Sequence, residues 1–231
     1  MTSQRKPNFI SFFPHGLFVE ALLKKRPVKR AFCRGEEGEF VFHLLADTDL
    51  AEIHVAEPDH ESIVTLQLKL DLLRRFTWNE FAEFFGGKSI HERLEKSERW
   101  FADSFSWHRK RRTHARYLRD IESLHRLKKR LSFLTLHGED YFHSLANYLP
   151  KSFDLIYLGR LLDEPALLKH ESWTEAIRSR LSENGRLVLL TDQDEDFVAD
   201  RMRACGFQID ERYNFDPQIS ALVFSSMLVE D

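Results

Sequence analysis

The chain has 231 residues and a mass of 27.4 kDa, which is enough for one well-buried core or two small ones. Its 42% hydrophobic and 31% charged residues are ordinary for a globular protein and argue against wholesale disorder. No stretch approaches the roughly 18 apolar residues that a membrane span needs. The 2 cysteines and 11 scattered histidines lack ligand spacing, so we predict no metal site and expect a cytoplasmic protein.

Turn residues and apolar periodicity divide the chain into a short N-terminal segment and a longer main domain. Residues 1–27 are rich in phenylalanine and end in a short helix before Pro27. We interpret them as cover for the core or as a lid over a ligand cleft. Residues 28–231 form the main domain, whose predicted strands are residues 28–34, 51–57, 132–136, 153–158, 186–191, 207–213 and 220–228. Its predicted helices are residues 39–45, 61–75, 141–149, 172–181 and 195–204.

Strands that alternate with helices and finish as two consecutive strands indicate an α/β fold with a doubly wound, mostly parallel sheet. The segment at about residues 76–130 reads as helix throughout, with capping-box patterns at Thr77–Glu80 and Ser89–Glu92. We predict that it forms a helical insertion between the helix at 61–75 and the strand at 132–136.

The residues that follow the strands are candidate site residues, because ligands of open parallel sheets bind beyond the carboxyl ends of the strands. A glycine there lets the backbone approach a ligand. An acid after the second strand can accept two hydrogen bonds from a ribose diol, and one after the third can accept from an adenine amino group. The candidate cofactor-binding residues are Gly35, Gly38, Glu57, Glu139, Asp140 and Gly159.

Each candidate also has a purely structural interpretation. The glycines can serve only as turns. Glu57, which precedes Pro58, can be a solvated strand end or a helix cap, and Asp140 can cap the helix that starts at Tyr141. Capping and ligand binding are not exclusive, so the sequence leaves both interpretations open.

The glycine loop after the first strand favours a cationic ligand over a dinucleotide. A dinucleotide fingerprint would read G-x-G-x-x-G, but Gly35 and Gly38 are accompanied by the acids Glu36, Glu37 and Glu39. Charges about 4 Å apart interact by ~1 kcal/mol even in water, so these acids would repel a pyrophosphate. S-adenosylmethionine, which carries a sulfonium and an ammonium, is the expected cofactor.

The second half of the chain resembles the class I S-adenosylmethionine-dependent transferases, the Rossmann-like folds of the methyltransferase type. The segments that carry the resemblance are Phe153-Asp154-Leu155-Ile156-Tyr157-Leu158, Leu181–Leu190 and Cys205-Gly206-Phe207. The resemblance implies an S-adenosylmethionine-binding sheet and a transferase activity.

Further segments are similar to the diacylglycerol aminocarboxypropyl transferases of betaine-lipid synthesis. They are Glu57-Pro58-Asp59, Leu66-Gln67-Leu68-Lys69-Leu70, Trp78–Gly86 and Leu158–Asp163. The first motif differs, because Cys33-Arg34-Gly35 stands where the family has small residues, and the N-terminal motif has no match. The resemblance implies transfer of an aminocarboxypropyl group to a lipid or small-molecule acceptor.

Asp163 is the candidate catalytic residue, a weak base that would take the proton of the acceptor. A helix cap before Pro165 is the competing interpretation of the same side chain. Two other functions stay open beside aminocarboxypropyl transfer: a methyltransferase, and a non-catalytic binding module on the same fold.

Residues 108–130 form a strongly basic segment, with ten Lys or Arg and two acidic residues, in a chain of net charge −3. On an amphipathic helix these bases would contact phosphates of an anionic membrane surface or of nucleic acid. A lipid acceptor would then place the protein at the periphery of a membrane. The competing interpretation is a solvated helix face with ion pairs to the acidic remainder.

Overall fold

The computed structural model describes residues 15–36, 38–75, 77, 121–160, 172–214 and 219–227. Their strands are β1 (Arg30–Arg34), β2 (Glu52–Ala56), β3 (Leu134–His137), β4 (Phe153–Gly159), β5 (Leu181–Thr191), β6 (Phe207–Tyr213) and β7 (Ser220–Ser226). Their helices are α1 (His15–Lys25), α2 (Glu39–Asp47), α3 (His60–Arg75), α6 (Ile121–Arg130), α7 (Tyr141–Ala146), α8 (Ser172–Arg180) and α9 (Glu195–Ala204).

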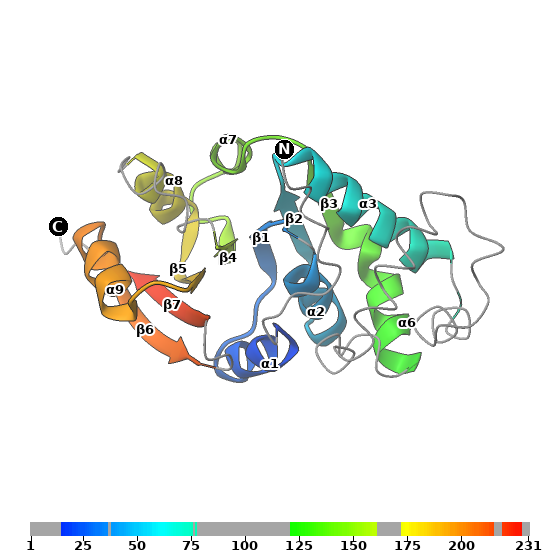
Figure 1. Cartoon of the computed structure of the whole chain (residues 1–231), viewed down its shortest axis with the longest axis horizontal. Coiled ribbons are helices and arrows are strands. Elements are labelled where there is room, and N and C mark those ends of the chain that lie inside the picture. The colour runs from blue at the N-terminus through cyan, green and yellow to red at the C-terminus, as the bar shows by residue number, and fades with distance from the viewer. Residues whose placement is uncertain are drawn as a thin grey trace, which may run out of the picture.

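The strands form one seven-stranded sheet in the order β3-β2-β1-β4-β5-β7-β6 (Figure 1). Strands β1 to β5 are parallel to one another, and β7 is antiparallel to both β5 and β6. This arrangement confirms the predicted doubly wound, mostly parallel α/β fold. The order reverses between β1 and β4, and the crevice at such a reversal is the usual ligand position in open α/β sheets.

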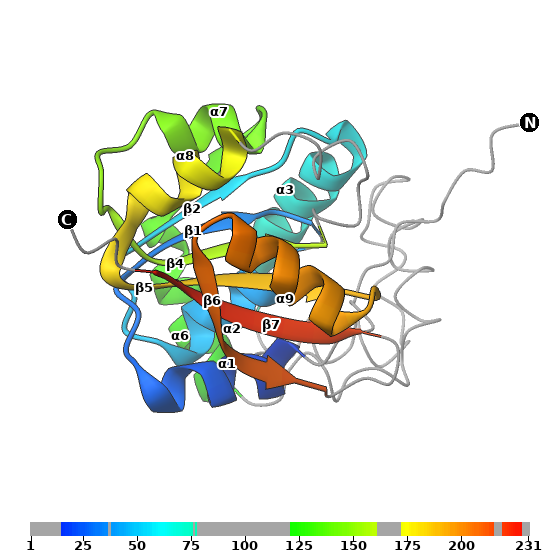
Figure 2. The ribbon, with the colours of Figure 1, turned by 90° about the vertical axis from the view of Figure 1, so that its left-hand side faces the viewer.

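Helices cover both faces of the sheet, because alternate residues of each strand are buried on opposite sides. In β1, Ala31 and Cys33 belong to one apolar cluster with residues of α1, α2, α3 and α6, whereas Phe32 belongs to a second cluster with residues of α7, α8 and α9. Figure 2 shows α1, α2 and α6 below the sheet and α7 and α8 above it, and α9 contributes to the same apolar cluster as α7 and α8. The sheet is therefore the middle layer of three.

The described part of the N-terminal segment is built into the core. Helix α1 buries Phe18 and Leu22 completely. The buried guanidinium of Arg186, in β5, donates to the backbone oxygens of Leu22 and Arg26 at 2.7 and 3.0 Å. These two carbonyls lie at the C-terminal end of α1, where a cation is favourable. Residues 1–14, the rest of the predicted cover or lid, lie outside the described residues.

Several element boundaries match the prediction and others do not. Helix α9 and strand β6 have the predicted bounds. Strand β5 begins at Leu181 rather than at the predicted residue 186, so it runs through Asn184-Gly185, a residue pair typical of turns. Its pairing with β4 is irregular there, and the extra residues are absorbed as a bulge. Helix α7 ends at Ala146, three residues before the predicted end at 149.

The predicted helical insertion is described only in its last part. Helix α6 follows α3 in the described chain and leads through a 3-10 turn into β3. The residues at 78–120 lie outside the described part of the chain. Within the described residues, none of the helices is long and apolar enough to cross a membrane.

Candidate functional site

The carboxyl ends of β1, β2 and β3 lie side by side, as parallel pairing requires. Arg34 pairs with Ala56, and Ala56 pairs with His137. The register continues one residue further, because the Glu57 N–H donates to the backbone oxygen of His137 at 3.0 Å and the Gly35 N–H donates to that of Ala56, also at 3.0 Å. Gly35 and Glu57 are thus brought together at the edge of the sheet where a ligand is expected.

Gly35 and Glu57 are in direct contact. A Cβ atom at Gly35 would lie 2.8 Å from the Cβ of Glu57, so only glycine allows the β1 backbone this close to β2. The Glu57 side chain is 1% exposed. Its Oε2 accepts from the Glu36 N–H at 2.7 Å and its Oε1 accepts from the Asp59 N–H at 3.1 Å. Glu57 therefore holds the loop that follows β1 in shape.

Burial raises the pKa of Glu57 above its usual value. The two backbone N–H groups and the charge of Arg34, whose Nε lies 4.0 Å from Oε2, oppose this effect without cancelling it. An ionised carboxylate offers about four acceptor positions, and the two hydrogen bonds use one on each oxygen. The predicted ribose contact of Glu57 stays a prediction.

Gly38 serves as the turn that starts α2. It is the N-cap residue with φ of 81°, in the left-handed region, and it gives the helix no side-chain cap. A Cβ atom there would meet the Leu66 side chain at 2.6 Å. Directly after it, Glu39 forms a buried ion pair with Lys69 of α3, with 3.2 Å between Oε1 and Nζ. The helix predicted at 61–75, observed as α3, is thereby fixed to the N-terminus of α2.

Glu36 makes contacts at the site that the sequence did not predict. Its φ of 41° is in the left-handed region that favours glycine. Its Oε1 accepts from the Arg160 N–H and its Oε2 from the Tyr157 hydroxyl, both at 3.0 Å. The same carboxylate lies directly against Gly159, whose φ of 57° a side chain would rarely adopt. Glu36 therefore bridges the ends of β1 and β4.

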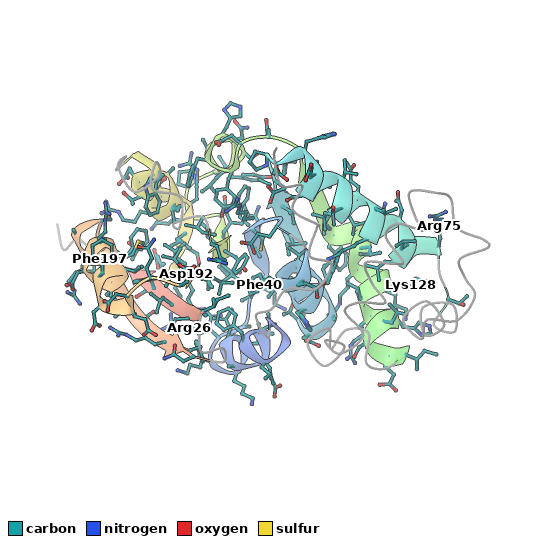
Figure 3. All side chains as sticks on the ribbon, in the orientation of Figure 1. Arg26, Phe40, Arg75, Lys128, Asp192 and Phe197 are labelled. Carbon is teal, nitrogen blue, oxygen red and sulfur yellow. The ribbon has the colours of Figure 1, made fainter. Side chains whose placement is uncertain are left out.

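The tyrosine that donates to the Glu36 carboxylate belongs to a buried aromatic pair. Tyr157 and Phe40 are both buried, and their rings stack with centroids 3.8 Å apart. Figure 3 shows Phe40 in the middle of the molecule, on α2 beside the sheet. Burial, and then the neighbouring Glu36, raise the pKa of the Tyr157 hydroxyl well above its usual value, so it stays protonated and donates to Glu36.

Glu139 and Asp140 follow β3 as predicted and make contacts with α7. Asp140 is the N-cap of α7 and accepts from the His143 N–H at 2.9 Å, which confirms the capping interpretation. Glu139 accepts from the Ser144 hydroxyl at 3.0 Å. Both acids are exposed at the edge of the sheet next to Glu57. Their contact with an adenine ring remains a prediction.

The predicted catalytic residue Asp163 lies outside the described residues. The described chain after β4 stops at Arg160, whose side chain pairs with Asp192 just beyond β5. Figure 3 shows Asp192 on the side of the molecule that carries α8 and α9. This ion pair connects the carboxyl ends of two neighbouring strands.

Two arginines in the described part of the basic segment make hydrogen bonds to another helix of the fold. Arg126 and Arg130 of α6 donate to the backbone oxygens of Ala46 and Leu45, both at 3.2 Å. These oxygens belong to the C-terminal end of α2, where cations are favourable. Lys128 lies on α6 on the side of the molecule away from α8 and α9 (Figure 3). Contacts of the whole segment with lipid or nucleic acid stay a prediction.

A second polar cluster lies on the α7 side of β2 and β3. His54 contacts Glu52 through Nε2, and its Nδ1 lies 2.6 Å from the Tyr148 hydroxyl. The same hydroxyl lies 3.0 Å from Nε2 of His137, and Arg30 donates to Glu52 at 2.8 Å. These histidines are distant in sequence, and only the pairing of β2 with β3 brings them together.

The residues at the crevice fit S-adenosylmethionine in charge. Two acids, Glu36 and Glu57, lie where the ends of β1, β2 and β4 meet. A cationic nucleoside suits this arrangement better than a pyrophosphate does. The side chain of Glu36 itself fills part of the space between Gly35 and Gly159.

No family model matches the chain, and no curated protein matches its sequence. Solved structures do resemble it. The rRNA methyltransferase aviRa from Streptomyces viridochromogenes has a TM-score of 0.57 and 16% identity, over 95% of this chain and 87% of that chain. The ribosomal protein L11 methylase from Lactobacillus delbrueckii subsp. bulgaricus has a TM-score of 0.52 and 12% identity, over 93% and 77%.

A third similar structure is the N-methyltransferase NodS from Bradyrhizobium japonicum WM9 in complex with S-adenosyl-L-homocysteine. Its TM-score is 0.51 and its identity is 13%, over 92% of this chain and 85% of that chain. These similarities show that the chain has the Rossmann-like fold of the methyltransferase type.

Proposed function

We propose that the chain is an S-adenosylmethionine-dependent transferase. The observation that carries the proposal is the buried Glu57 carboxylate at the end of β2, in contact with Gly35 and next to the reversal of strand order. An acid in this place suits the ribose of an adenosyl ligand. The fold adds support, since one similar structure holds S-adenosyl-L-homocysteine.

When bound, the cofactor would supply a carbon made electrophilic by the adjacent sulfonium. The protein's part would be to orient the acceptor in line with that carbon and to exclude water. The transfer would join the acceptor atom to that carbon as the carbon–sulfur bond breaks with its electron pair going to sulfur, and a base of the protein would take the acceptor's proton. Asp163 is the proposed base.

The finer proposal is aminocarboxypropyl transfer to a lipid or small-molecule acceptor, as the resemblance at Glu57-Pro58-Asp59 and Trp78–Gly86 implies. Methyl transfer is the alternative, and the fold supports it equally. The two reactions leave different products, because attack at the γ carbon leaves methylthioadenosine and attack at the methyl carbon leaves S-adenosylhomocysteine.

A second candidate function has an observation of its own. The Glu36 side chain occupies part of the crevice and is held there by Arg160 and Tyr157. A non-catalytic binding module on the same fold would keep such a side chain in place permanently. Under this alternative the basic segment at 108–130 would dock on its partner, an anionic membrane surface or a nucleic acid.

Calorimetric titration of the full chain with S-adenosylmethionine tests the proposal. We expect saturable binding, and we expect Glu57→Gln to weaken it at least tenfold while Glu52→Gln, at the other end of β2, leaves it unchanged. No heat and no thermal shift at millimolar ligand would support the binding module instead. Mass spectrometry of the nucleoside product then distinguishes the two transfer reactions.

A further inference from the structure

The position of Glu36 points to a role in selecting the charge state of the cofactor. We propose that Glu36 is a specificity-determining residue, which makes the crevice prefer the cationic sulfonium compound to the neutral thioether that remains after transfer. The inference rests on the proposed function and goes beyond it, because it concerns which form of the cofactor is retained and which is released.

Glu36 is held at both its backbone and its side chain. Its N–H donates to the buried Glu57 carboxylate at 2.7 Å. Its two carboxylate oxygens accept from the Arg160 N–H and the Tyr157 hydroxyl at 3.0 Å. One donor is backbone and the other is a buried side chain stacked on Phe40. The negative charge is thus fixed in place rather than carried by a solvated surface side chain.

The fixed charge lies where the strand order reverses. Glu36 follows β1, and its carboxylate lies against Gly159 at the end of β4. In open α/β sheets this crevice receives the ligand. A ligand seated between these two strand ends would have the Glu36 carboxylate beside it.

A carboxylate beside the reacting centre distinguishes ligands that differ only in charge. S-adenosylmethionine carries a sulfonium, sinefungin carries an amine in its place, and S-adenosylhomocysteine has a neutral thioether. The attraction between opposite charges at a protein surface is strong enough to change affinity by about tenfold or more. The thioether gains none of this attraction, so it would leave the site more readily after transfer.

Titration calorimetry of the full chain with all three compounds tests the inference. For Glu36→Gln we expect binding of S-adenosylmethionine and sinefungin to weaken about tenfold, with S-adenosylhomocysteine changed less than about twofold. Glu36→Asp, which keeps the charge, should retain most of the preference. Glu183→Gln, which removes an exposed acid paired with Lys151 near the start of β5, should change none of the three affinities.

The possible outcomes separate the inference about Glu36 from the transferase proposal. Equal weakening of all three compounds by Glu36→Gln would mean that Glu36 is structural or contacts the α-ammonium that all three share, and equal tightening would make it an obstruction. Each of these results overturns the inference and leaves the transferase proposal standing. A wild-type chain that binds none of the three compounds overturns the transferase proposal as well. Thermal unfolding of each variant establishes that it is folded before its affinities are compared.

Discussion

Strand β2 is flanked by two glutamates in opposite environments. Glu57, just beyond its carboxyl end, is 1% exposed and is held by the N–H groups of Glu36 and Asp59. Glu52, its first residue, is part-exposed and contacts the side chains of Arg30 and His54. The Glu57 carboxylate, at the ligand edge, is thus held mainly by backbone N–H groups. The Glu52 carboxylate, at the opposite edge, is held by the side chains of Arg30 and His54.

The two pKa values move in opposite directions for this reason. Burial raises the pKa of Glu57. Partial burial also acts to raise the pKa of Glu52, but the hydrogen bonds and charges of His54 and Arg30 outweigh it, and the pKa falls below its usual value. A charge matched by side-chain cations contributes to stability, whereas a buried charge held by backbone N–H groups keeps the capacity to attract a cationic ligand.

Removal of the Glu57 side chain should have the largest effect. In Glu57→Ala the N–H groups of Glu36 and Asp59 lose their acceptor, and buried unsatisfied donors cost about 1–3 kcal/mol each. The carboxylate's own desolvation offsets part of this, so we expect the free energy of unfolding to fall by about 2 kcal/mol. Urea denaturation measures it. Glu52→Ala, the matched control, should cost less than about 1 kcal/mol because Glu52 and its partner Arg30 are both part-exposed; equal losses would contradict the comparison.

The pH dependence of the two glutamates should have opposite signs. Glu52 has a lowered pKa, so its contribution is present above the usual value of 4.5 and is lost as the pH falls through the lowered value. Glu57 has a raised pKa, so its contribution is present below 4.5 and is lost as the pH rises through the raised value.

Unfolding free energies measured from pH 3 to pH 7 for the wild type, Glu52→Gln and Glu57→Gln give the test. The difference between wild type and Glu52→Gln should shrink as the pH falls, by about 0.5 kcal/mol after allowance for solvent screening. The difference between wild type and Glu57→Gln should grow, by about 1 kcal/mol. Slopes of the same sign for both variants would refute the assigned environments.

Loss of the Arg160 side chain should have the smallest effect. Arg160 holds Glu36 through its backbone N–H, which Arg160→Ala retains, and the substitution removes the exposed ion pair with Asp192. We expect the free energy of unfolding to change by less than about 0.5 kcal/mol. Differential scanning calorimetry measures it, and a loss as large as that of Glu57→Ala would mean that side-chain charge, not backbone, organises the crevice.

The sequence predicted the fold well where local signals are strong. Helix α9 has the capping residue Asp194 before it and Gly206 soon after its end, and both of its bounds are as predicted. Strand β5 was predicted too short, because Asn184-Gly185 is a typical turn pair and the bulge opposite Phe153 depends on tertiary pairing. Local propensity does not carry that information.

The sequence predicted where the candidate site lies in the fold, but it did not predict which side chains contact one another there. The order of strands and helices was enough to bring Gly35 and Glu57 to one edge, and to make Asp140 a helix cap. The role of Glu36 needed its positive φ and the closeness of Gly159, neither of which a sequence displays. The pair of acids between Gly35 and Gly38 was the available signal, and it did not indicate which acid lies against Gly159.

The buried guanidinium of Arg186 has a consequence for dissecting the chain. It joins β5 to the end of α1 across more than 150 positions of sequence, through the carbonyls of Leu22 and Arg26. A shortened chain that starts at residue 28 would leave the Arg186 guanidinium without these two acceptors. It would also expose the apolar surface that Phe18 and Leu22 cover. Helix α1 is therefore part of the hydrophobic core, and its removal would destabilise the fold rather than expose a ligand site.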